Sequence, residues 1–512
     1  MKSALMNDFE ITRSGLLYDI LIIGGGINGA GIARDAAGRG LKVLLCEKDD
    51  LAAHTSSAST KLIHGGLRYL EHYDFALVRK ALMEREVLLK AAPHIIWPLR
   101  FIMPHHKDLR PSWLIRIGLF LYDHLGGRKI LPATKTLKRS RDAVFDPLKS
   151  EFTKGFEYSD CWVEDARLVA LNAVDAAARG AEIMTRTECV SLDAKDGHWD
   201  VGLRVDGHAE KRIAAKTVIN AAGPWVDHVA GITGSRANSP SVRLVKGSHI
   251  IVPSLFDDER CFIFQAGDGR IVFAIPYEDG RFTLIGTTDL PFEGDLNAVS
   301  ASDEEIDYLC KLSNEYFERQ ITPSDVVSTY SGVRPLFEDH AADASSVTRD
   351  YVLKLEEQDG AKMLSVIGGK ITTYRKLAED ALKVLKPALP KHSGAWTDTI
   401  ALPGGDIAGA DFEAFESDCA AKYEWLDAAI RHRLARTYGT KIHEILKDTS
   451  SETDLGHHYG AGLYQKEVDY LVRHEFARTC EDILERRTKL GLHMSPEEIS
   501  ALRDHFDPRL VA

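Results

Sequence analysis

Residues 18–47 read YDILIIGGGINGAGIARDAAGRGLKVLLCE, and this stretch decides the fold. Its first part, 18–24, is a short apolar run of the kind that forms a central strand buried on both faces. Glycines follow, and residues 27–40 have the spacing of a helix, while 42–47 form a second apolar run. The stretch therefore predicts a strand–helix–strand unit that opens a doubly wound parallel sheet, an α/β fold.

The glycines between the two predicted strands form the dinucleotide fingerprint G-x-G-x-x-G. Gly24 permits the tight turn, Gly26 lets the backbone approach a pyrophosphate, and Gly29 allows helix and strand to pack closely. Glu47 lies 23 residues after Gly24, where a carboxylate accepts hydrogen bonds from ribose hydroxyls and disfavours a 2′-phosphate. The fingerprint does not separate NAD from FAD. Because no second fingerprint follows, we expect no separate nicotinamide-binding domain.

Length and composition limit the class of protein. A chain of 512 residues with 44% apolar and 27% charged residues is expected to fold into about two or three globular domains. The net charge of −12 disfavours nucleic-acid binding, and seven scattered cysteines without a CxxC motif disfavour a disulfide framework. The N-terminus lacks a secretory signal pattern, and no run reaches the roughly 18 apolar residues that span a bilayer. We expect a protein of the cytosol or of a membrane surface.

Beyond the fingerprint, the pattern predicts a helix, a sheet and a helical tail. Residues 74–92 are charged and amphipathic, which is typical of a surface helix. Short β-type runs between about 180 and 300 predict an antiparallel sheet added to the first domain. Proline and glycine at 386–405 mark a linker. The helical stripes beyond it, such as Val468 to Ile483, indicate a domain for packing or oligomerisation.

Four further segments combine small, hydroxyl-bearing and basic residues. They read TSSASTKLIHGGLRYL at 55–70, NAAGPW at 220–225, YSGVRPL at 330–336 and GGKITTYRK at 368–376. Together with the glycine fingerprint and KGSHIIV at 246–252, they resemble, in order and spacing, the FAD-dependent glycerol-3-phosphate dehydrogenases. That family belongs to the wider group of D-amino-acid-oxidase-like flavoproteins. The resemblance runs from about residue 18 to the C-terminus.

The resemblance implies a fold and a domain organisation. We expect a Rossmann-like FAD-binding domain with an antiparallel substrate-capping sheet, followed by an all-helical C-terminal domain. The expected boundaries are a tail at 1–17, the FAD-binding domain at 18–388 and the helical domain at 389–512. The cap is expected mainly at about 97–160 and 225–335.

The resemblance also implies an activity. Members of the family oxidise sn-glycerol 3-phosphate to dihydroxyacetone phosphate, with hydride transfer to FAD and electrons passed to a membrane quinone. We therefore expect a peripheral protein at the cytoplasmic face of the inner (plasma) membrane, or otherwise a cytoplasmic one. The oligomeric state is left open, with a homodimer as one of the alternatives. The alternatives are a glycerol-3-phosphate oxidase that makes hydrogen peroxide, an amine or amino-acid oxidase of the same fold, and a flavoprotein without catalysis.

A phosphate substrate needs cations in its binding site. We expect Arg334 to clamp the phosphate because a guanidinium binds oxyanions in a fork. Arg68 and Lys370 are the next candidates, and Tyr69 is expected to line the same pocket. Lys370 is also a candidate for contact with the flavin, and these two roles are compatible.

Removal of the proton from the C2 hydroxyl needs a base, and histidine is suited to this near neutral pH. His64 is the leading candidate because it lies between the hydroxyl-rich loop and two glycines, as in the family. His249 is the alternative base or a hydrogen-bond donor to the substrate. We expect no metal site, since adjacent histidine pairs do not have the spacing of metal ligands.

The resemblance places FAD against the fingerprint, the hydroxyl-rich loop and the later glycine-containing segments. The residues expected to contact it are Gly24, Gly26, Ile27, Asn28, Gly29, Glu47, Thr55, Ser56, Ser57, Leu62, Val190, Ala221, Gly223, Gly369, Lys370 and Thr372. Because no histidyl or cysteinyl attachment motif is seen at the N-terminus, noncovalent FAD is preferred.

Residues 97–131 mix aromatic and basic side chains with apolar ones. This mixture suits a membrane interface, and an ordinary buried helix with extended arginines is the alternative interpretation. Because the resembled family reduces a quinone that is confined to lipid, we favour membrane contact through this segment.

Overall fold

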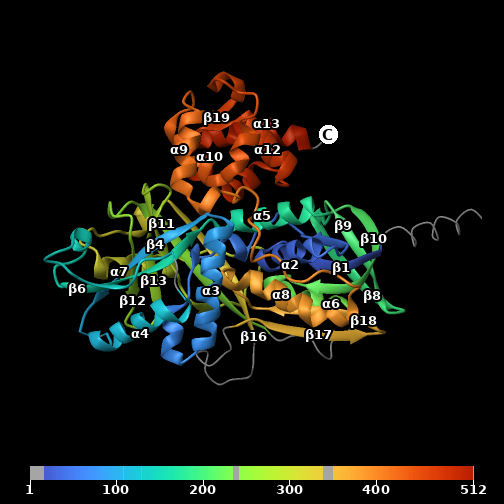
Figure 1. Cartoon of the computed structure of the whole chain (residues 1–512), viewed down its shortest axis with the longest axis horizontal. Coiled ribbons are helices and arrows are strands. Elements are labelled where there is room, and N and C mark those ends of the chain that lie inside the picture. Colours follow the sequence, from blue (N-terminus) through green and yellow to red (C-terminus); the bar gives the residue numbers. More distant parts are fainter. Residues whose placement is uncertain (1–16, 108, 128–129, 235–241, 338–349, 511–512) are drawn as a thin grey trace, which may run out of the picture.

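The computed structural model describes residues 17–107, 109–127, 130–234, 242–337 and 350–510. The expected N-terminal tail at 1–17 therefore lies outside the described residues, except for Leu17. Figure 1 shows an elongated body built around two sheets, with a separate group of helices above it.

The glycine fingerprint belongs to a mixed sheet, which we name the cofactor sheet. In spatial order its main strands are β17 (Val352–Gln358), β18 (Ala361–Ile367), β10 (Ala209–Asn220), β1 (Leu17–Ile23), β2 (Val43–Cys46) and β7 (Glu182–Met184). Strand β1 runs parallel to both β2 and β10. Helix α2 (Ile27–Gly38) connects β1 to β2, so the predicted strand–helix–strand unit is confirmed.

The cofactor sheet is buried on both faces. Ile20 and Ile22 of β1 pack into one hydrophobic cluster, and Leu21 and Ile23 pack into another on the opposite face. The first cluster includes α2 and two helices beside it, α5 (Asp165–Ala178) and α8 (Tyr374–Leu385), whereas α6 (Val226–Ile232) belongs to the second. Burial on both faces explains why the strand is continuously apolar instead of alternating.

The second sheet, the cap sheet, lies beside the cofactor sheet. Its strands are β3 (Leu62–Ile63), β4 (Ile96–His105), β5 (Lys135–Lys138), β6 (Lys154–Val163), β11 (Val242–Pro253), β12 (Cys261–Gln265), β13 (Ile271–Tyr277), β14 (Phe282–Gly286), β15 (Leu290–Pro291) and β16 (Ser328–Phe337). Most of its pairs are antiparallel, and helix α7 (Asp303–Tyr316) packs against β11 and β14.

The expectation of one antiparallel sheet between about 180 and 300 needs correction. Strands β8 (Thr187–Lys195) and β9 (His198–Val205) extend the cofactor sheet through antiparallel pairing with β10. Of the strands between 180 and 300, only those from β11 to β15 join the cap sheet. Short β-type runs have the same pattern in either sheet, because the pattern does not encode which strand is the partner.

The segment 97–131 divides between a strand and a helix. Strand β4 lies inside the cap sheet, and helix α4 (Ser112–Leu125) follows it. Of the aromatic residues, Phe101 and Tyr122 are buried, whereas Trp113 is 65% exposed and Phe120 is 58% exposed. Residues 128–129 of the segment lie outside the described residues. The helix expected at 74–92 is confirmed as α3 (Phe75–Ala91).

The C-terminal domain is helical apart from a short hairpin. Its helices are α9 (Phe412–Lys422), α10 (Ala428–Tyr438), α11 (Ile442–Ile445), α12 (Gln465–His474) and α13 (Pro496–Leu510), and the hairpin joins β19 (His458–Gly460) to β20 (Leu463–Tyr464). It has a hydrophobic core of its own, drawn entirely from residues 407–502. Figure 1 shows the domain, in orange and red, seated on the body above α5.

The stripe from Val468 to Ile483 does not form one helix. Helix α12 ends at His474, Phe476 has a positive φ of 60°, and a separate π-helical turn covers Asp482–Arg487. Helical spacing therefore marked the core-facing residues without marking the break. No helix among the described residues has the length and apolarity that crossing a bilayer requires.

Candidate active site

A cavity of about 2580 Å³ lies between the cofactor sheet and the cap sheet. Its lining includes the glycine fingerprint at one end and His64, His249 and Arg334 at the other. We name these the dinucleotide end and the substrate end. The loops after the parallel strands of the cofactor sheet open onto the cavity, which is where doubly wound folds bind their ligands.

Two of the fingerprint glycines, Gly24 and Gly29, occupy positions where a side chain would collide with backbone. Gly24 has a φ of +113°, and a Cβ there would lie 2.5 Å from the carbonyl oxygen of Ala221. A Cβ at Gly29 would lie 1.9 Å from the carbonyl oxygen of Gly24. The close packing that the sequence predicted for Gly29 is therefore present. It brings the N-terminus of α2, with its partial positive charge, to the cavity wall.

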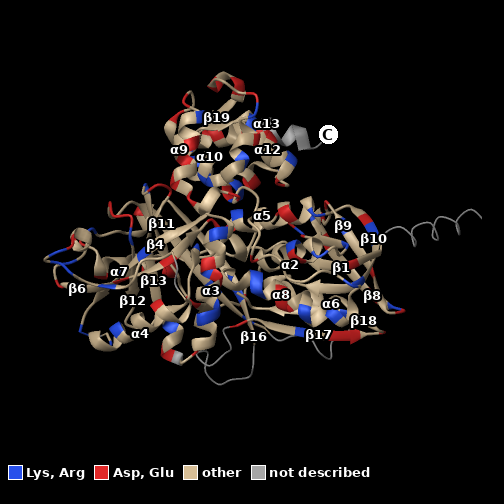
Figure 2. Cartoon of the chain, viewed as in Figure 1, with Lys and Arg blue, Asp and Glu red and all other residues tan. Residues whose placement is uncertain are grey.

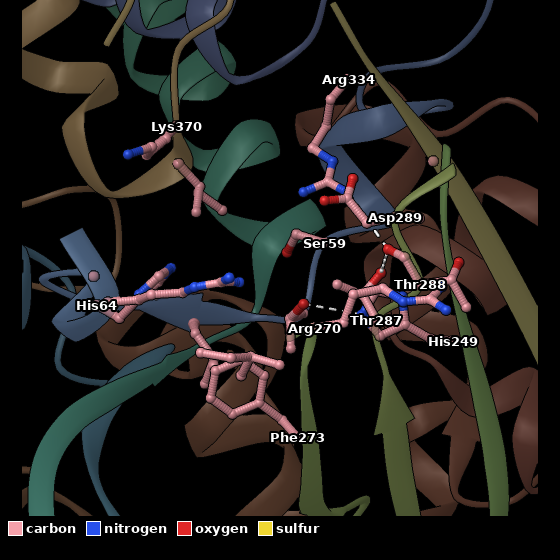
Figure 3. A pocket seen from close by; sticks show the side chains of 18 of the residues that line it. Ser59, His64, His249, Arg270, Phe273, Thr287, Thr288, Asp289, Arg334 and Lys370 are labelled. Carbon is pink, nitrogen blue, oxygen red and sulfur yellow. Dashed lines mark hydrogen bonds and ion pairs between the residues drawn. The ribbon is translucent and has the colours of Figure 1, made fainter. Parts of the chain in front are cut away.

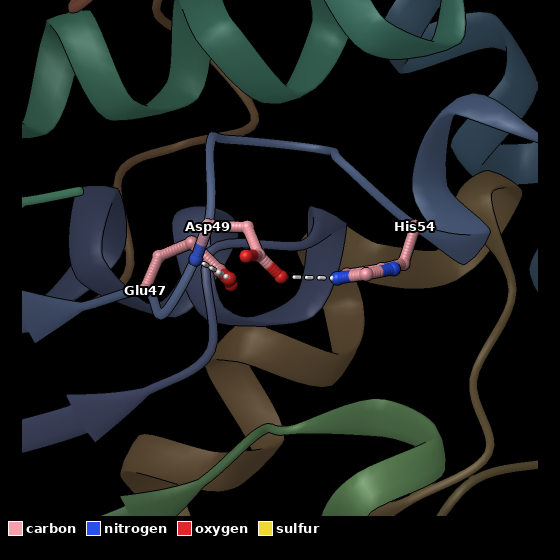
Figure 4. Close-up of side chains that lie close together, drawn as sticks. All are labelled: Glu47, Asp49 and His54. Carbon is pink, nitrogen blue, oxygen red and sulfur yellow. Dashed lines mark hydrogen bonds and ion pairs between the residues drawn. The ribbon is translucent and has the colours of Figure 1, made fainter. Parts of the chain in front are cut away.

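Glu47 is held in place by the backbone around it. Its Oε2 accepts a hydrogen bond from the Gly25 N–H at 2.6 Å, and its Oε1 accepts one from the Asp49 N–H at 2.8 Å. Burial raises the pKa of Glu47, and these two donors oppose the shift. Figure 4 shows Glu47 beside Asp49, which in turn is joined to His54 at 2.6 Å. These three residues lie close enough to share a cation, but their hydrogen bonds account for the arrangement without one.

The hydroxyl-rich loop closes over the start of α2. Ser56 Oγ accepts a hydrogen bond from the Ile27 N–H at 3.0 Å, and Thr55 Oγ1 donates to the Val333 carbonyl at 2.7 Å. Asn28 donates from Nδ2 to the Gly368 carbonyl at 3.1 Å, but its buried Oδ1 has no hydrogen-bond partner. An unpaired buried acceptor on the cavity wall fits a bound group that donates a hydrogen bond, such as a cofactor hydroxyl or N–H.

Most of the residues expected to contact the cofactor line the cavity. Those that do are Gly24, Gly26, Ile27, Asn28, Glu47, Thr55, Ser56, Leu62, Ala221, Gly223, Gly369 and Lys370. Four of the expected residues do not line it, namely Gly29, Ser57, Val190 and Thr372, although Glu188 and Cys189 line it next to Val190. Thr372 supports the wall, because its Oγ1 accepts a hydrogen bond from the His64 N–H at 3.2 Å.

All six residues expected at the substrate end line the cavity: His64, Arg68, Tyr69, His249, Arg334 and Lys370. Figure 3 shows His64, His249, Arg334 and Lys370 arranged around a common space. They come from the end of β3, from β11, from β16 and from the loop after β18. The fold therefore assembles this end from four segments that are spread between residues 64 and 370 of the chain.

His249 is packed as a neutral ring. Its Nε2 lies 2.9 Å from Thr60 Oγ1, and the ring stacks on Tyr330 with centroids 4.6 Å apart. Gly286 makes room for it, because a Cβ there would lie 2.1 Å from the ring. Burial, together with the charges of Lys61 and Arg334, lowers the pKa of His249 to about 3, and its buried Nδ1 has no partner.

His64 is the second neutral histidine at the substrate end. Burial lowers its pKa, the Asp160 carboxylate opposes the shift, and Lys370 and Arg85 add to it. A neutral imidazole has a nitrogen lone pair that accepts a proton. Both expected candidates for the base are therefore neutral, and a pKa of about 3 makes His249 a weak base at neutral pH.

The cations at the substrate end are only partly neutralised. Arg334 contacts the Asp289 carboxylate at 3.1 Å, and both side chains remain about half exposed. The Lys370 Nζ lies 3.9 Å from the centroid of the Tyr69 ring. A cation on an aromatic face keeps its charge available for an anion. The arrangement can therefore bind an anionic substrate.

Sequence reasoning missed a group of polar residues around Arg334. Thr287, Thr288 and Asp289 line the cavity after β14, and Arg270 lines it before β13. Buried Glu305 holds this region together, because it accepts hydrogen bonds from Thr288 Oγ1 at 2.7 Å and Ser248 Oγ at 2.8 Å. The signal was a run of polar residues directly after an apolar strand, a pattern that by itself indicates only the end of that strand.

Comparisons with known proteins agree with this geometry. Residues 19–375 match the family described as "FAD dependent oxidoreductase", and residues 395–505 match "C-terminal domain of alpha-glycerophosphate oxidase". A solved structure of glycerol-3-phosphate dehydrogenase from Bacillus halodurans, complexed with FAD, superimposes with a TM-score of 0.75 at 27% identity. The match covers 98% of this chain and 95% of that chain.

Several relatives are about half identical to this chain. D-erythritol 1-phosphate dehydrogenase of Brucella abortus is 52% identical over 96% of this chain and 97% of its own length. Glycerol-3-phosphate dehydrogenase of Pseudomonas aeruginosa is 52% identical (94% and 93%), and the aerobic enzyme of Escherichia coli is 48% identical (94% and 96%). The predicted fold and cofactor are confirmed, and the chain belongs to the family of FAD-dependent glycerol-3-phosphate dehydrogenases within the FAD-dependent oxidoreductases.

Proposed function

We propose that this protein oxidises sn-glycerol 3-phosphate to dihydroxyacetone phosphate with FAD as the first electron acceptor. The observation that carries the proposal is the meeting of two neutral histidines and three cations at one end of a cavity whose other end is a dinucleotide fingerprint. FAD supplies the hydride acceptor when it is bound, and the chain supplies binding, orientation and proton removal.

The role of each residue follows from its charge and position. Arg334, Lys370 and Arg68 bind the phosphate dianion, with Tyr69 beside them. His64 removes the proton from the C2 hydroxyl, or His249 does so. The histidine that is not the base donates a hydrogen bond that orients the substrate. Fixed contacts of this kind hold the C2 hydrogen in one direction, which is the main contribution a protein makes to hydride transfer.

A longer polyol phosphate is a second candidate substrate. The relative from Brucella abortus carries the name D-erythritol 1-phosphate dehydrogenase, and its identity to this chain equals that of the Pseudomonas aeruginosa enzyme. Both substrates present a phosphate to the same cations and a secondary hydroxyl to a base. An amine or amino-acid substrate is less suited, because the cations at the substrate end favour an anion without a positive group.

We further propose that electrons leave to a membrane quinone and that α4 seats the protein on the lipid surface at the cytoplasmic face of the inner membrane. Trp113, Ile117, Phe120 and Leu121 are the exposed large apolar residues of α4. Ile117 and Leu121 also line the cavity, so the exposed apolar surface adjoins the active site. Apolar and aromatic residues on one exposed helix fit an interfacial contact.

The proposed chemistry is tested by the visible spectrum of the purified holoenzyme under anaerobic conditions. Glycerol 3-phosphate should bleach the flavin bands. The same measurement with D-erythritol 1-phosphate shows which of the two substrates reduces the flavin faster. A spectrum that glycerol 3-phosphate leaves unchanged would refute the proposal. If hydrogen peroxide forms in air as fast as substrate is lost, the electron acceptor is oxygen and not a quinone.

The proposed membrane contact is tested by flotation with anionic vesicles at low salt. The double variant Trp113→Ser, Phe120→Ser should lose flotation. The matched control is Leu355→Ser with Ile400→Ser, since these exposed apolar residues lie on β17 and in the linker. Equal flotation of all three proteins would show that α4 is not the contact.

We also propose that the boundary between the FAD-binding domain and the helical domain lies at 388/389. Limited proteolysis should cleave the chain near this boundary if the division is right.

A further inference from the structure

The loop after Glu47 has a residue that faces away from the cavity. Glu47, Lys48 and Asp49 line the cavity, but Asp50 does not, and it is only 2% exposed. A buried carboxylate is costly unless it is paired. The partners of Asp50 therefore show what holds this end of the cofactor site.

The partners come mainly from the C-terminal domain. Arg487 Nη1 donates to Asp50 Oδ2 at 2.7 Å, and Arg487 Nη2 donates to Asp50 Oδ1 at 2.9 Å. Arg486 Nε donates to Asp50 Oδ2 at 2.7 Å. Arg487 is 1% exposed, so this two-pronged ion pair is fully enclosed. Acidic and basic residues occur throughout both the body and the C-terminal domain (Figure 2), but few pairs are as buried as this one.

A second carboxylate completes the network. Asp482 of the C-terminal domain accepts hydrogen bonds from Arg186 Nη2 at 2.7 Å and from Arg486 Nη2 at 2.6 Å. Arg186 itself lines the cavity, and its Nη1 lies 3.5 Å from Asp50 Oδ1. The network thus connects the C-terminal domain to the turn between β7 and β8 as well as to the loop after β2.

The backbone carries this connection to Glu47. The Glu47 N–H donates to the Met184 carbonyl at 2.9 Å, and the Arg186 N–H donates to the Asp49 carbonyl at 2.8 Å. Asp50 follows Glu47 by three residues, so a shift of the Asp50 side chain displaces a short, hydrogen-bonded loop. The carboxylate expected to bind the cofactor ribose lies in that loop.

We propose that Arg487 is a positioning residue through which the C-terminal domain holds the loop from Glu47 to Asp50 and thereby sets the affinity for FAD. The C-terminal domain then has a function in cofactor retention, separate from substrate binding. This inference depends on membership of the FAD-dependent family and not on the identity of the substrate.

The chain offers a matched control in a second buried pair between the same two parts. Arg167 of α5 pairs with Glu475 of the C-terminal domain, and both side chains are buried. Neither residue lines the cavity, and neither belongs to the loop after Glu47. Loss of Arg167 removes the ion-pair partner of the Glu475 carboxylate, whereas Asp50 keeps Arg486 after loss of Arg487, so Arg167→Gln is expected to cost at least as much stability as Arg487→Gln.

The experiment compares Arg487→Gln with Arg167→Gln in the full-length holoenzyme. Dissociation of FAD is followed by the rise in free flavin fluorescence on dilution, and thermal unfolding is measured on the same samples. We expect both variants to lower Tm, but only Arg487→Gln to raise the Kd for FAD, by about tenfold or more, as for the loss of other residues that position a ligand-binding group. Arg487 also donates to the backbone carbonyl of Glu475 at 2.9 Å, so the control pair shares Glu475 with Arg487 but lacks the contact with Asp50. Arg167→Gln should stay within about twofold of wild type, because Arg167 and the Glu475 carboxylate do not contact the loop from Glu47 to Asp50.

Equal Kd values for FAD in the two variants, or an unchanged Kd in Arg487→Gln beside a lowered Tm, would overturn the proposal. Arg487→Lys is the second variant if Arg487→Gln does not fold. It keeps the charge but loses the two-pronged contact, so its Kd should lie between those of wild type and Asp50→Asn. The proposal would also be overturned if Arg487→Lys and Asp50→Asn both had the same Kd for FAD as wild type.

Discussion

The two ends of the cavity differ in how far their charged groups are satisfied by the chain itself. At the dinucleotide end, Glu47 accepts from two backbone N–H groups and Ser56 accepts from Ile27, while the uncharged Asn28 Oδ1 has no partner. At the substrate end, the buried Nδ1 of His249 has no partner, and Arg334 is only partly neutralised by Asp289. The first end is rigid through local contacts. The second end leaves charge and hydrogen-bonding capacity for the ligand to satisfy. Substitutions at the first end should therefore change stability and FAD binding, and substitutions at the second end should change the rate and KM.

The largest effect is expected at the dinucleotide end from Gly29→Ala. Because the new Cβ would lie 1.9 Å from the Gly24 carbonyl oxygen, α2 must move away from β1. We expect a loss of about 3 kcal/mol or more of folding stability, together with the loss of bound FAD. Thermal unfolding and the flavin absorbance of the purified protein measure both effects.

Gly231→Ala is the matched control for this change. Gly231 also lies in a helix, but no atom lies within 4 Å of the position that a Cβ would take there. Alanine there should raise stability by about 0.5–1 kcal/mol through helix propensity, with FAD retained. If the Gly29→Ala protein retains FAD and is as stable as wild type, the close packing at Gly29 is not required at the dinucleotide end.

The second largest effect is expected at the substrate end from His64→Asn. Loss of a general base lowers rates by about 10²- to 10⁴-fold. The rate of flavin reduction in anaerobic stopped flow should fall by that factor, while FAD stays bound with its normal spectrum. His249→Asn is the paired variant, because Asn keeps a polar group in each position. The variant with the larger loss identifies the base, and wild-type rates in both would exclude a histidine base.

The difference between the two ends also explains what could be predicted from the sequence. The glycine fingerprint and Glu47 lie within one continuous stretch, so spacing alone predicted the tight turn at Gly24, the close packing at Gly29 and a carboxylate at Glu47 beside them. The six residues of the substrate end meet only through the fold, and the family resemblance, not local spacing, located them. Physical reasoning about charge then gave their expected roles.

What the sequence did not reveal depended on contacts between distant segments. The partner of β9 is β10 and not the cap, because pairing is a property of the assembled sheet. Asp289 matters because it contacts Arg334, and Glu305 matters because it accepts a hydrogen bond from Thr288. Neither contact can be deduced from the local sequence. Arg487 lies in a segment that spacing marked as helical packing, and its carboxylate partner is more than 400 residues away.

A smaller effect is expected from Arg334→Ala. Hydrogen bonds to a charged group contribute about 1.5–3 kcal/mol, so KM for glycerol 3-phosphate should rise by about 10- to 100-fold. KM for glycerol, which has no phosphate, should change much less. Asp289→Asn is the opposite test, because removing the carboxylate that competes at Arg334 should lower the KM of the phosphate substrate a few-fold. An equal KM change for glycerol and its phosphate in Arg334→Ala would show that the charge is not used.

The smallest effect is expected from pH. A base must be unprotonated, so the rate of flavin reduction falls as pH drops through the pKa of the base. Because the pKa of His64 is lowered from 6.5 and that of His249 is lowered to about 3, the rate at saturating substrate should change less than about twofold between pH 8 and 6.5. If His249 is the base, the fall in rate should come only near pH 3. A rate that is already halved at pH 6.5 would mean that the base is exposed to solvent, and the unsatisfied, buried character of the substrate end would no longer hold.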